Sequence, residues 1–264
     1  EFQKPHAGRA CWQAINTLGS ILGIWVGLFF LHRAMGNGEV SSSSGWWATV
    51  LLSCLAGLFL VRAFIIFHDC GHGSFVKSIR ANNTLGFITG LLTLTPFHHW
   101  KWEHSKHHAT TGDLSRRGVG DIWTLTVKEY LESTRWKRFT YRLTRNPIIL
   151  FLIGPLFLFF VLQRFCAKSA KPRERRSVYL MNLAIVVMSA SLIAIFGFVP
   201  WLVIQLTMMT VAGCSGVWLF YVQHQFEDAY WVKGDEWDYT TAAMEGSSFY
   251  KLPKILQWFS GNIG

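Results

Sequence analysis

The sequence predicts an all-α integral membrane protein, with four transmembrane helices in two hairpins, a cytoplasmic histidine-rich cap and two short in-plane or re-entrant segments. Hydrophobic residues make up 51% of the 264 residues and charged residues only 15%, whereas a soluble domain has about 25% charged residues. Four runs approach the roughly 20 apolar residues that cross a bilayer. The connection "GNGEVSSSSG" and the junction around Pro200 contain no Lys or Arg, which is typical of turns on the non-cytoplasmic side.

The four spans are nearly continuous apolar runs, and we expect them at about residues 14–33, 46–67, 178–198 and 201–222. Two further apolar runs, 85–97 and 148–162, have thirteen and fifteen residues, which is too short for a span and favours in-plane or re-entrant segments. We expect a single membrane domain over residues 1–264. Because the chain starts without methionine and stops at "SGNIG", we interpret both ends as cuts within a longer protein.

The basic residues predict the orientation of the chain. Between Arg62 and Arg176 lie 19 of the 25 Lys and Arg residues. The positive-inside rule therefore places this central region, the histidine clusters and both chain ends on the cytoplasmic side. We interpret the net charge of +10 as juxtamembrane charge that attracts anionic lipid, and we expect no nucleic-acid partner.

Six of the ten histidines lie at the expected cytoplasmic ends of spans or in the loop between them. In "HDCGH" two histidines are spaced i, i+4, and in "HSKHH" three are spaced i, i+3, i+4, so each set shares a helical face. The five cysteines are scattered, which favours imidazole over thiolate as the metal ligand. One metal rarely takes more than four protein ligands, so six histidines predict two metals. The candidate ligands and catalytic residues are His68, His72, His104, His107, His108 and His224.

Other polar and aromatic residues lie near these clusters. Asp69 lies within the first cluster and Glu103 precedes the second, and both either accept a ring N–H from a ligand or supply charge to a helix N-terminus. We interpret His6, His32, His98 and His99 as ordinary hydrogen-bonded histidines, because they lack ligand spacing. The flanking aromatic residues are typical of an interfacial belt, with the mouth of an apolar tunnel as the alternative: Phe97, Trp100, Trp102, Phe226, Tyr230 and Trp231.

The motifs "HDCGHGSF", "WEHSKHHATTGDLSRRGVGDIW" and "YVQHQFEDAYW" together resemble the membrane fatty-acyl desaturases, and especially the bacterial and plant acyl-lipid ω-6 (Δ12) enzymes. The resemblance covers nearly the whole chain. It implies a non-haem di-iron centre to which the six histidines contribute as ligands, with O2 as co-substrate, that introduces a cis double bond into the acyl chain of a membrane lipid. It also implies a separate electron donor, ferredoxin or a cytochrome b5-type protein, because no such segment is fused to the chain.

This family carries a third histidine box, which the resemblance places just after "LPKILQWFSGNIG". Since the chain stops at Gly264, we expect residues 1–264 alone to be inactive. Two alternatives remain open. A related di-iron hydroxylase, ketolase or epoxygenase uses the same histidines. A histidine-rich metal-binding or transport protein belongs to a different class, and it would place its ligands near the middle of the spans.

Overall fold

The structure is a computed structural model that describes residues 5–118 and 120–262. Over these residues every regular element is a helix, and the connecting turns and loops contain one isolated bridge between Asp113 and Val232. The elements in chain order are α1 (Ala7–Gly36), α2 (Ser42–His72), α3 (Ile79–Leu92), α4 (Phe97–Thr110), α5 (Val127–Glu132), α6 (Arg135–Thr144), η1 (Ile149–Ile153), α7 (Gly154–Phe160), η2 (Leu162–Arg164), α8 (Pro172–Phe196), α9 (Phe198–His224), η3 (Gly234–Glu236), α10 (Tyr239–Glu245) and α11 (Lys254–Phe259).

Four helices in the described residues, α1, α2, α8 and α9, are long and apolar enough to cross a membrane, which confirms the four predicted spans. They have 25 to 31 residues. At 1.5 Å per residue such helices are longer than the roughly 30 Å hydrocarbon core, so their ends reach past it. The helix α6 and the segment Ile149–Arg164 pass the same test when taken together, with a bend of 64° between them, and counting this pair as one span gives five. The predicted short run 148–162 lies in this second segment.

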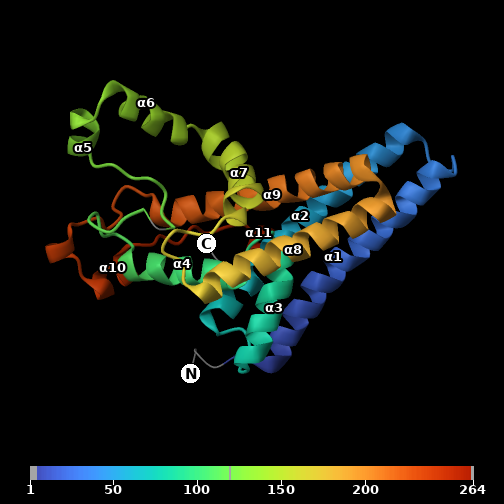
Figure 1. Cartoon of the computed structure of the whole chain (residues 1–264), viewed down its shortest axis with the longest axis horizontal. Helices are drawn as coiled ribbons and strands as arrows, with labels where there is room; N and C mark the ends of the chain where they lie inside the picture. The colour runs from blue at the N-terminus through green and yellow to red at the C-terminus, as the bar shows by residue number, and fades with distance from the viewer. Residues whose placement is uncertain (1–4, 119, 263–264) are drawn as a thin grey trace.

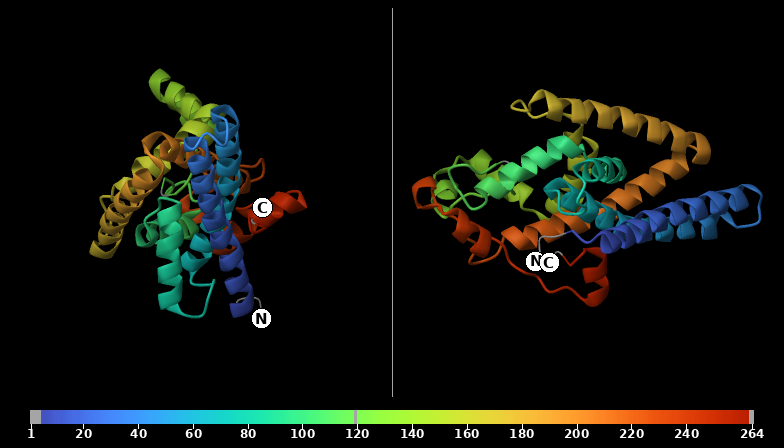
Figure 2. Two further views of the ribbon diagram at one scale, coloured as in Figure 1. Left: turned by 90° about the vertical axis from the view of Figure 1, so that its right-hand side faces the viewer. Right: turned by 90° about the horizontal axis from the view of Figure 1, so that it is seen from below.

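The long helices form two hairpins that point the same way (Figure 1). The turn between α1 and α2 and the turn between α8 and α9 lie at one end of the molecule, and α4 lies toward the other end. Gly197 has φ +83°, a conformation that favours glycine and allows the abrupt reversal from α8 to α9. Figure 2 shows that α8 and α9 diverge from this turn, whereas α1 and α2 stay side by side.

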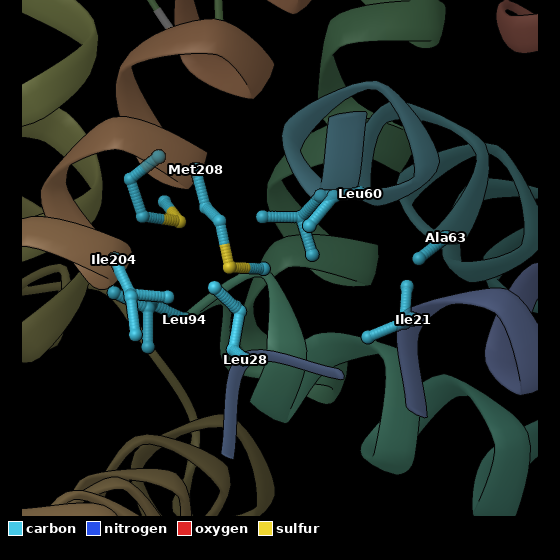
Figure 3. Packing of buried hydrophobic residues seen from close by; sticks show 9 residues of the cluster. Ile21, Leu28, Leu60, Ala63, Leu94, Ile204 and Met208 are labelled. Carbon is cyan, nitrogen blue, oxygen red and sulfur yellow. The ribbon is translucent and has the colours of Figure 1, made fainter. Parts of the chain in front are cut away.

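The core lies where α1, α2 and α9 pack together. Figure 3 shows the buried side chains that fill it, among them Ile21, Leu28, Leu60, Ala63, Leu94, Ile204 and Met208. The helices come close because α2 has a glycine at the contact: a Cβ on Gly57 would lie 2.7 Å from Val211 Cβ. This contact fixes the position of α9 relative to α2, and both helices carry candidate metal ligands near their C-terminal ends.

Aromatic packing holds α4 against the end of α2. Phe97, the first residue of α4, is buried, and its ring lies 5.5 Å from the ring of Phe67. One turn further along, Trp100 packs on Phe67 with a centroid distance of 4.7 Å. The helix α2 ends directly after His72, because Gly73 adopts a left-handed conformation with φ +72°. The C-terminal turns of α2 therefore face the middle of α4.

Candidate metal centre

Helices α2 and α4 bring four histidines into one cluster. His68 and His72 lie in the last two turns of α2, and His104 and His108 lie one turn apart on α4. Each of the four offers one ring nitrogen, and these nitrogen atoms all lie within 4.8 Å of one another. As predicted, the i, i+4 spacing places two histidines on one face of each helix, and the two pairs face each other.

The donor set of this cluster fits a cation. His104 Nε2 lies 3.0 Å from His72 Nε2 and 3.0 Å from His108 Nε2. A neutral imidazole nitrogen carries either one proton or one lone pair. Consequently the single proton or lone pair of His104 Nε2 can align with only one of these two nitrogen atoms, and the other close contact is left unsatisfied. A metal ion among the nitrogen atoms removes this conflict, because each lone pair then points at positive charge.

The protonation state of the α4 histidines favours metal binding as well. Burial, together with the charge of neighbouring histidines, lowers the pKa of His104 from 6.5 to about 2. The same causes lower the pKa of His108 to about 4. Both rings therefore stay neutral at physiological pH, and the neutral ring is the form that binds a metal.

The third histidine of α4 faces another way. The ring of His107 lies 5.0 Å from the ring of His224 on α9 and 5.3 Å from that of Phe220. It remains next to the cluster, since its centroid lies 5.7 Å from that of His108. The six candidate histidines thus form one contiguous group with two parts, four residues between α2 and α4 and two between α4 and α9.

A carboxylate that sequence reasoning missed orients His107. Asp121 Oδ1 lies 2.8 Å from His107 Nδ1, and both side chains are almost fully buried. Asp121 also accepts a hydrogen bond from the backbone N–H of Gly118. The loop comes this close because Gly120 has φ +74°, and a Cβ there would lie 3.2 Å from His107 Cβ. The available signal was a single acidic residue in the glycine-containing loop "RRGVGD" after the second histidine motif.

His224 is oriented in a similar way by a backbone carbonyl. Its Nδ1 lies 3.2 Å from the oxygen of Gly246, which can only accept a hydrogen bond, so this nitrogen carries the proton. The second nitrogen, Nε2, then keeps its lone pair. His107 and His224 both border a small cavity whose wall also includes Thr111, Asp121, Phe220, Tyr230 and Trp231. These two imidazoles, each held through Nδ1, have the arrangement that metal-binding histidines usually show.

The two carboxylates singled out in the sequence lie at different places. Asp69 Oδ1 lies 3.1 Å from Nδ1 of His68, within the cluster. Glu103 lies instead beside His99, 3.4 Å from its Nδ1, and burial raises the pKa of the Glu103 carboxyl group. His99 is itself buried, and its Nε2 accepts a hydrogen bond from the backbone N–H of Ala167. Glu103 thus contacts a histidine outside the cluster.

The aromatic residues near the motifs have several positions. Trp100 stacks on His104 at 4.3 Å with an interplanar angle of 18°, so it supports the cluster from the side of α2. Trp102 lies under the ammonium group of Lys106, at 3.6 Å. Tyr230 and Trp231 border the cavity at His107. At the far end of the chain, His6 caps α1, accepting a hydrogen bond from the backbone N–H of Arg9.

The fold and the site define a class, all-helical membrane proteins with a histidine cluster that could hold a metal at the ends of their spans. Residues 44–264 match the family model of the fatty acid desaturases. The fatty acid desaturase of Bacillus subtilis is 47% identical over 263 residues, which cover 100% of this chain and 72% of that protein. The chain therefore belongs to the fatty acid desaturase family, and it is a membrane-embedded oxidoreductase of lipid metabolism.

More distant relatives act on lipids, according to their names. The sn-1 oleoyl-lipid 12-desaturase of Synechocystis is 26% identical over 269 residues, which cover 97% of this chain and 69% of that protein. The sn-1 acyl-lipid omega-3 desaturase (ferredoxin) of the same organism is 26% identical over 235 residues, which cover 83% of this chain and 63% of that protein. Both agree with the resemblance seen in the histidine motifs.

Proposed function

We propose that the protein is a di-iron acyl-lipid desaturase, which introduces a cis double bond into an acyl chain of a membrane lipid. The observation that carries this proposal is the meeting of six histidines from α2, α4 and α9 in one contiguous group, in a member of this family. The lipid substrate is supported by the names of the relatives, which include an oleoyl-lipid desaturase.

The reaction is an oxidation. A –CH2–CH2– unit loses two hydrogen atoms and becomes –CH=CH–, while O2 accepts these two hydrogen atoms, two electrons and two further protons to give two molecules of water. The C–H bonds are not acidic, so a side-chain base cannot break them; the irons, when bound, supply the activation of O2 that this step needs. Neutral imidazoles suit this chemistry, because thiolate ligands would be oxidised themselves.

The residues of the chain divide this work. In our proposal His68, His72, His104 and His108 hold one iron, and His107 and His224 contribute to the second. Asp121 and the carbonyl group of Gly246 keep the rings of His107 and His224 in the tautomer that leaves Nε2 free. The Asp69 carboxylate orients His68 in the same manner.

The electrons come, in this proposal, from a separate ferredoxin or cytochrome b5-type protein. One relative is named for ferredoxin, which supports the first of these donors. We place the histidine group and both chain ends on the cytoplasmic side. The support for this orientation is the concentration of Lys and Arg between Arg62 and Arg176, together with hairpin turns that lie at the opposite end from α4 (Figure 1).

The test is to express the full-length gene that contains residues 1–264 in a host without polyunsaturated lipids, and to analyse fatty-acid methyl esters by gas chromatography and mass spectrometry. We expect a new diene, its loss in His107→Ala, and its retention in the matched control His6→Ala, which changes an exposed histidine outside the histidine cluster. Hydroxylated or keto fatty acids would contradict desaturation and favour a related hydroxylase or ketolase. Unchanged lipids with tight zinc binding would contradict both and favour a metal-binding protein.

A further inference from the structure

Helix α6 carries an apolar stripe that is exposed. Trp136, Phe139 and Leu143 follow the spacing i, i+3, i+7, so they lie along one face of the helix. Their exposed fractions are 72%, 49% and 45%. The rings of Trp136 and Phe139 stack on each other at 5.5 Å, which extends the stripe as one continuous apolar surface.

The opposite face of α6 attaches it to the protein. Tyr141 packs edge-on against Trp123 at 5.3 Å and contacts Tyr130 at 5.8 Å. At the C-cap, Arg145 donates hydrogen bonds to Gln225 Oε1 at 2.8 Å and to the carbonyl oxygen of Trp123 at 2.7 Å. At about 100° per residue, Tyr141 lies roughly opposite the Phe139 and Leu143 stripe. The attachment therefore turns the apolar stripe outward.

The charge of α6 is entirely positive. Its sequence "RWKRFTYRLT" has four basic residues and no acidic residue, and Arg145 follows directly. On a helical wheel Arg135 and Arg142 border the stripe, and Lys137 and Arg138 lie further around. Long basic side chains beside an apolar stripe can cover it with their methylene groups while their charges reach lipid phosphates. This combination is typical of helices that lie in the interface of an anionic membrane.

The segment that follows α6 in the chain also exposes apolar residues, so the apolar surface continues beyond the stripe. After α6 the chain bends by 64° into Ile149–Arg164, where Leu152, Ile153 and Phe157 are also exposed. In a membrane protein, such a segment exposes its apolar residues to lipid. The helix α6 meets this segment at a steep angle and carries basic residues and a tryptophan beside its apolar stripe. These are the features of a helix that lies in the lipid headgroup layer.

We propose that α6 lies in the plane of an anionic membrane leaflet, with Trp136, Phe139 and Leu143 inserted at the boundary of the acyl chains and its basic residues bound to lipid phosphates. The occupant of the stripe is lipid and not a second protein. This contact would hold the Trp123 loop, which docks on α6 and directly follows Asp121, at a fixed height above the membrane.

The experiment uses the full chain in lipid nanodiscs, with a fluorescent amino acid introduced at position 139 or, as a matched control on another face of the same helix, at position 137. One quencher is phosphatidylcholine with a nitroxide near the top of its acyl chain, and the other is aqueous iodide. We expect lipid quenching at position 139 to exceed that at 137 by about twofold or more, with the opposite order for iodide. Addition of phosphatidylglycerol should increase lipid quenching at 139, and Arg135→Gln combined with Arg138→Gln and Arg142→Gln should abolish that increase.

Three results would overturn the proposal. Equal iodide quenching at the two positions would mean that the stripe faces water. Protection of position 139 from both quenchers would mean that a protein, such as a second copy of this chain, covers it. Lipid quenching that does not respond to phosphatidylglycerol would refute the role of anionic lipid. Because the helix itself is kept in every variant, none of these outcomes requires an unfolded protein.

Discussion

Asp121 and His107 form a buried pair, with 2.8 Å between Oδ1 and Nδ1, although thirteen residues of helix and loop separate them in the sequence. Only 7% of the Asp121 side chain and 4% of the His107 side chain are exposed. A carboxylate in this position accepts the Nδ1 proton, which leaves Nε2 free to bind a metal. Within our proposal the pair determines how His107 and His224 together hold the second iron.

Asp121→Asn tests this role. The substitution preserves size but replaces the charged acceptor with an amide, which holds the ring tautomer less firmly. On the proposed function we expect iron content or diene production to decrease by about 10- to 100-fold, as is usual for such partners of metal ligands. Asp228→Asn, at an exposed position, is the control and should leave both unchanged. Wild-type iron content and activity in Asp121→Asn would refute an orienting role for this carboxylate.

The low pKa values on α4 predict that the metal-free protein is sensitive to acid. In the folded state burial holds the pKa of His104 at about 2 and that of His108 at about 4, below the ordinary value of 6.5. Between pH 4 and 6.5 the unfolded chain therefore binds more protons, so stability increases with pH in this window. We expect the Tm of metal-free protein in detergent to be steady above pH 6.5 and to fall as the pH decreases toward 4.

The control separates this effect from the titration of carboxyl groups. His108→Gln removes one of the two shifted histidines, so its Tm should fall less between pH 6.5 and 4 than that of the wild type. Addition of metal should oppose the fall, because a bound metal keeps the imidazoles unprotonated. A Tm profile with the same slope in His108→Gln and the wild type would show that the α4 histidines do not determine the acid sensitivity.

The long helices and half of the site follow from sequence periodicity. A span must be apolar over about 20 residues, so hydropathy alone locates α1, α2, α8 and α9. The i, i+4 spacing correctly predicted that His68 pairs with His72 and His104 with His108. It also grouped His107 with its neighbours, whereas in the structure this ring turns toward α9. That difference depends on which helix packs on which side of α4, and periodicity within α4 does not contain this information.

Sequence patterns did not predict the contacts of Asp121 and Glu103, for a different reason. Asp121 reaches His107 because Gly118 and Gly120 both have positive φ angles, which bend the loop back over α4. Glu103 precedes the histidine motif in the sequence but contacts His99, since its position on the helix surface matches i, i+4 with that residue. Spacing along a helix is regular and predictable, whereas the path of a loop depends on tertiary contacts.

Gly57 is predicted to be essential for the packing of α2 against α9. A Cβ on Gly57 would lie 2.7 Å from Val211 Cβ and 2.9 Å from the carbonyl oxygen of Met208, and the backbone of α9 cannot move without displacing His224. We expect Gly57→Ala to destabilise the protein by about 1–3 kcal/mol in thermal unfolding, as overpacking generally does. Gly19→Ala is the matched control, because nothing lies within 4 Å of a Cβ there. Equal stability of the two variants would show that α2 and α9 can move apart with little loss of folding free energy.

Arg62 is predicted to hold α11 on the transmembrane bundle. This nearly buried side chain of α2 donates to the carbonyl oxygen of Trp258, and its guanidinium lies 3.9 Å from the centre of the Trp258 ring. It also donates to Thr17 Oγ1 on α1 at 3.3 Å. One cationic group thus connects three helices, and such a group within a membrane protein is rarely placed without a function.

Arg62→Met keeps a long apolar side chain but removes these hydrogen bonds. The hydrogen bond to Trp258 is worth about 1 kcal/mol, so the population in which α11 is detached should increase by roughly fivefold. The measurement is the rate at which the lysine-specific protease Lys-C cleaves after Lys251 and Lys254 in the folded protein, which we expect to rise by a similar factor when cleavage requires detachment. Arg33→Met, an exposed position on α1, serves as the control. An unchanged rate in Arg62→Met would mean that aromatic packing alone, with Phe59 against the rings of Trp258 and Phe259, is sufficient to hold α11 in place.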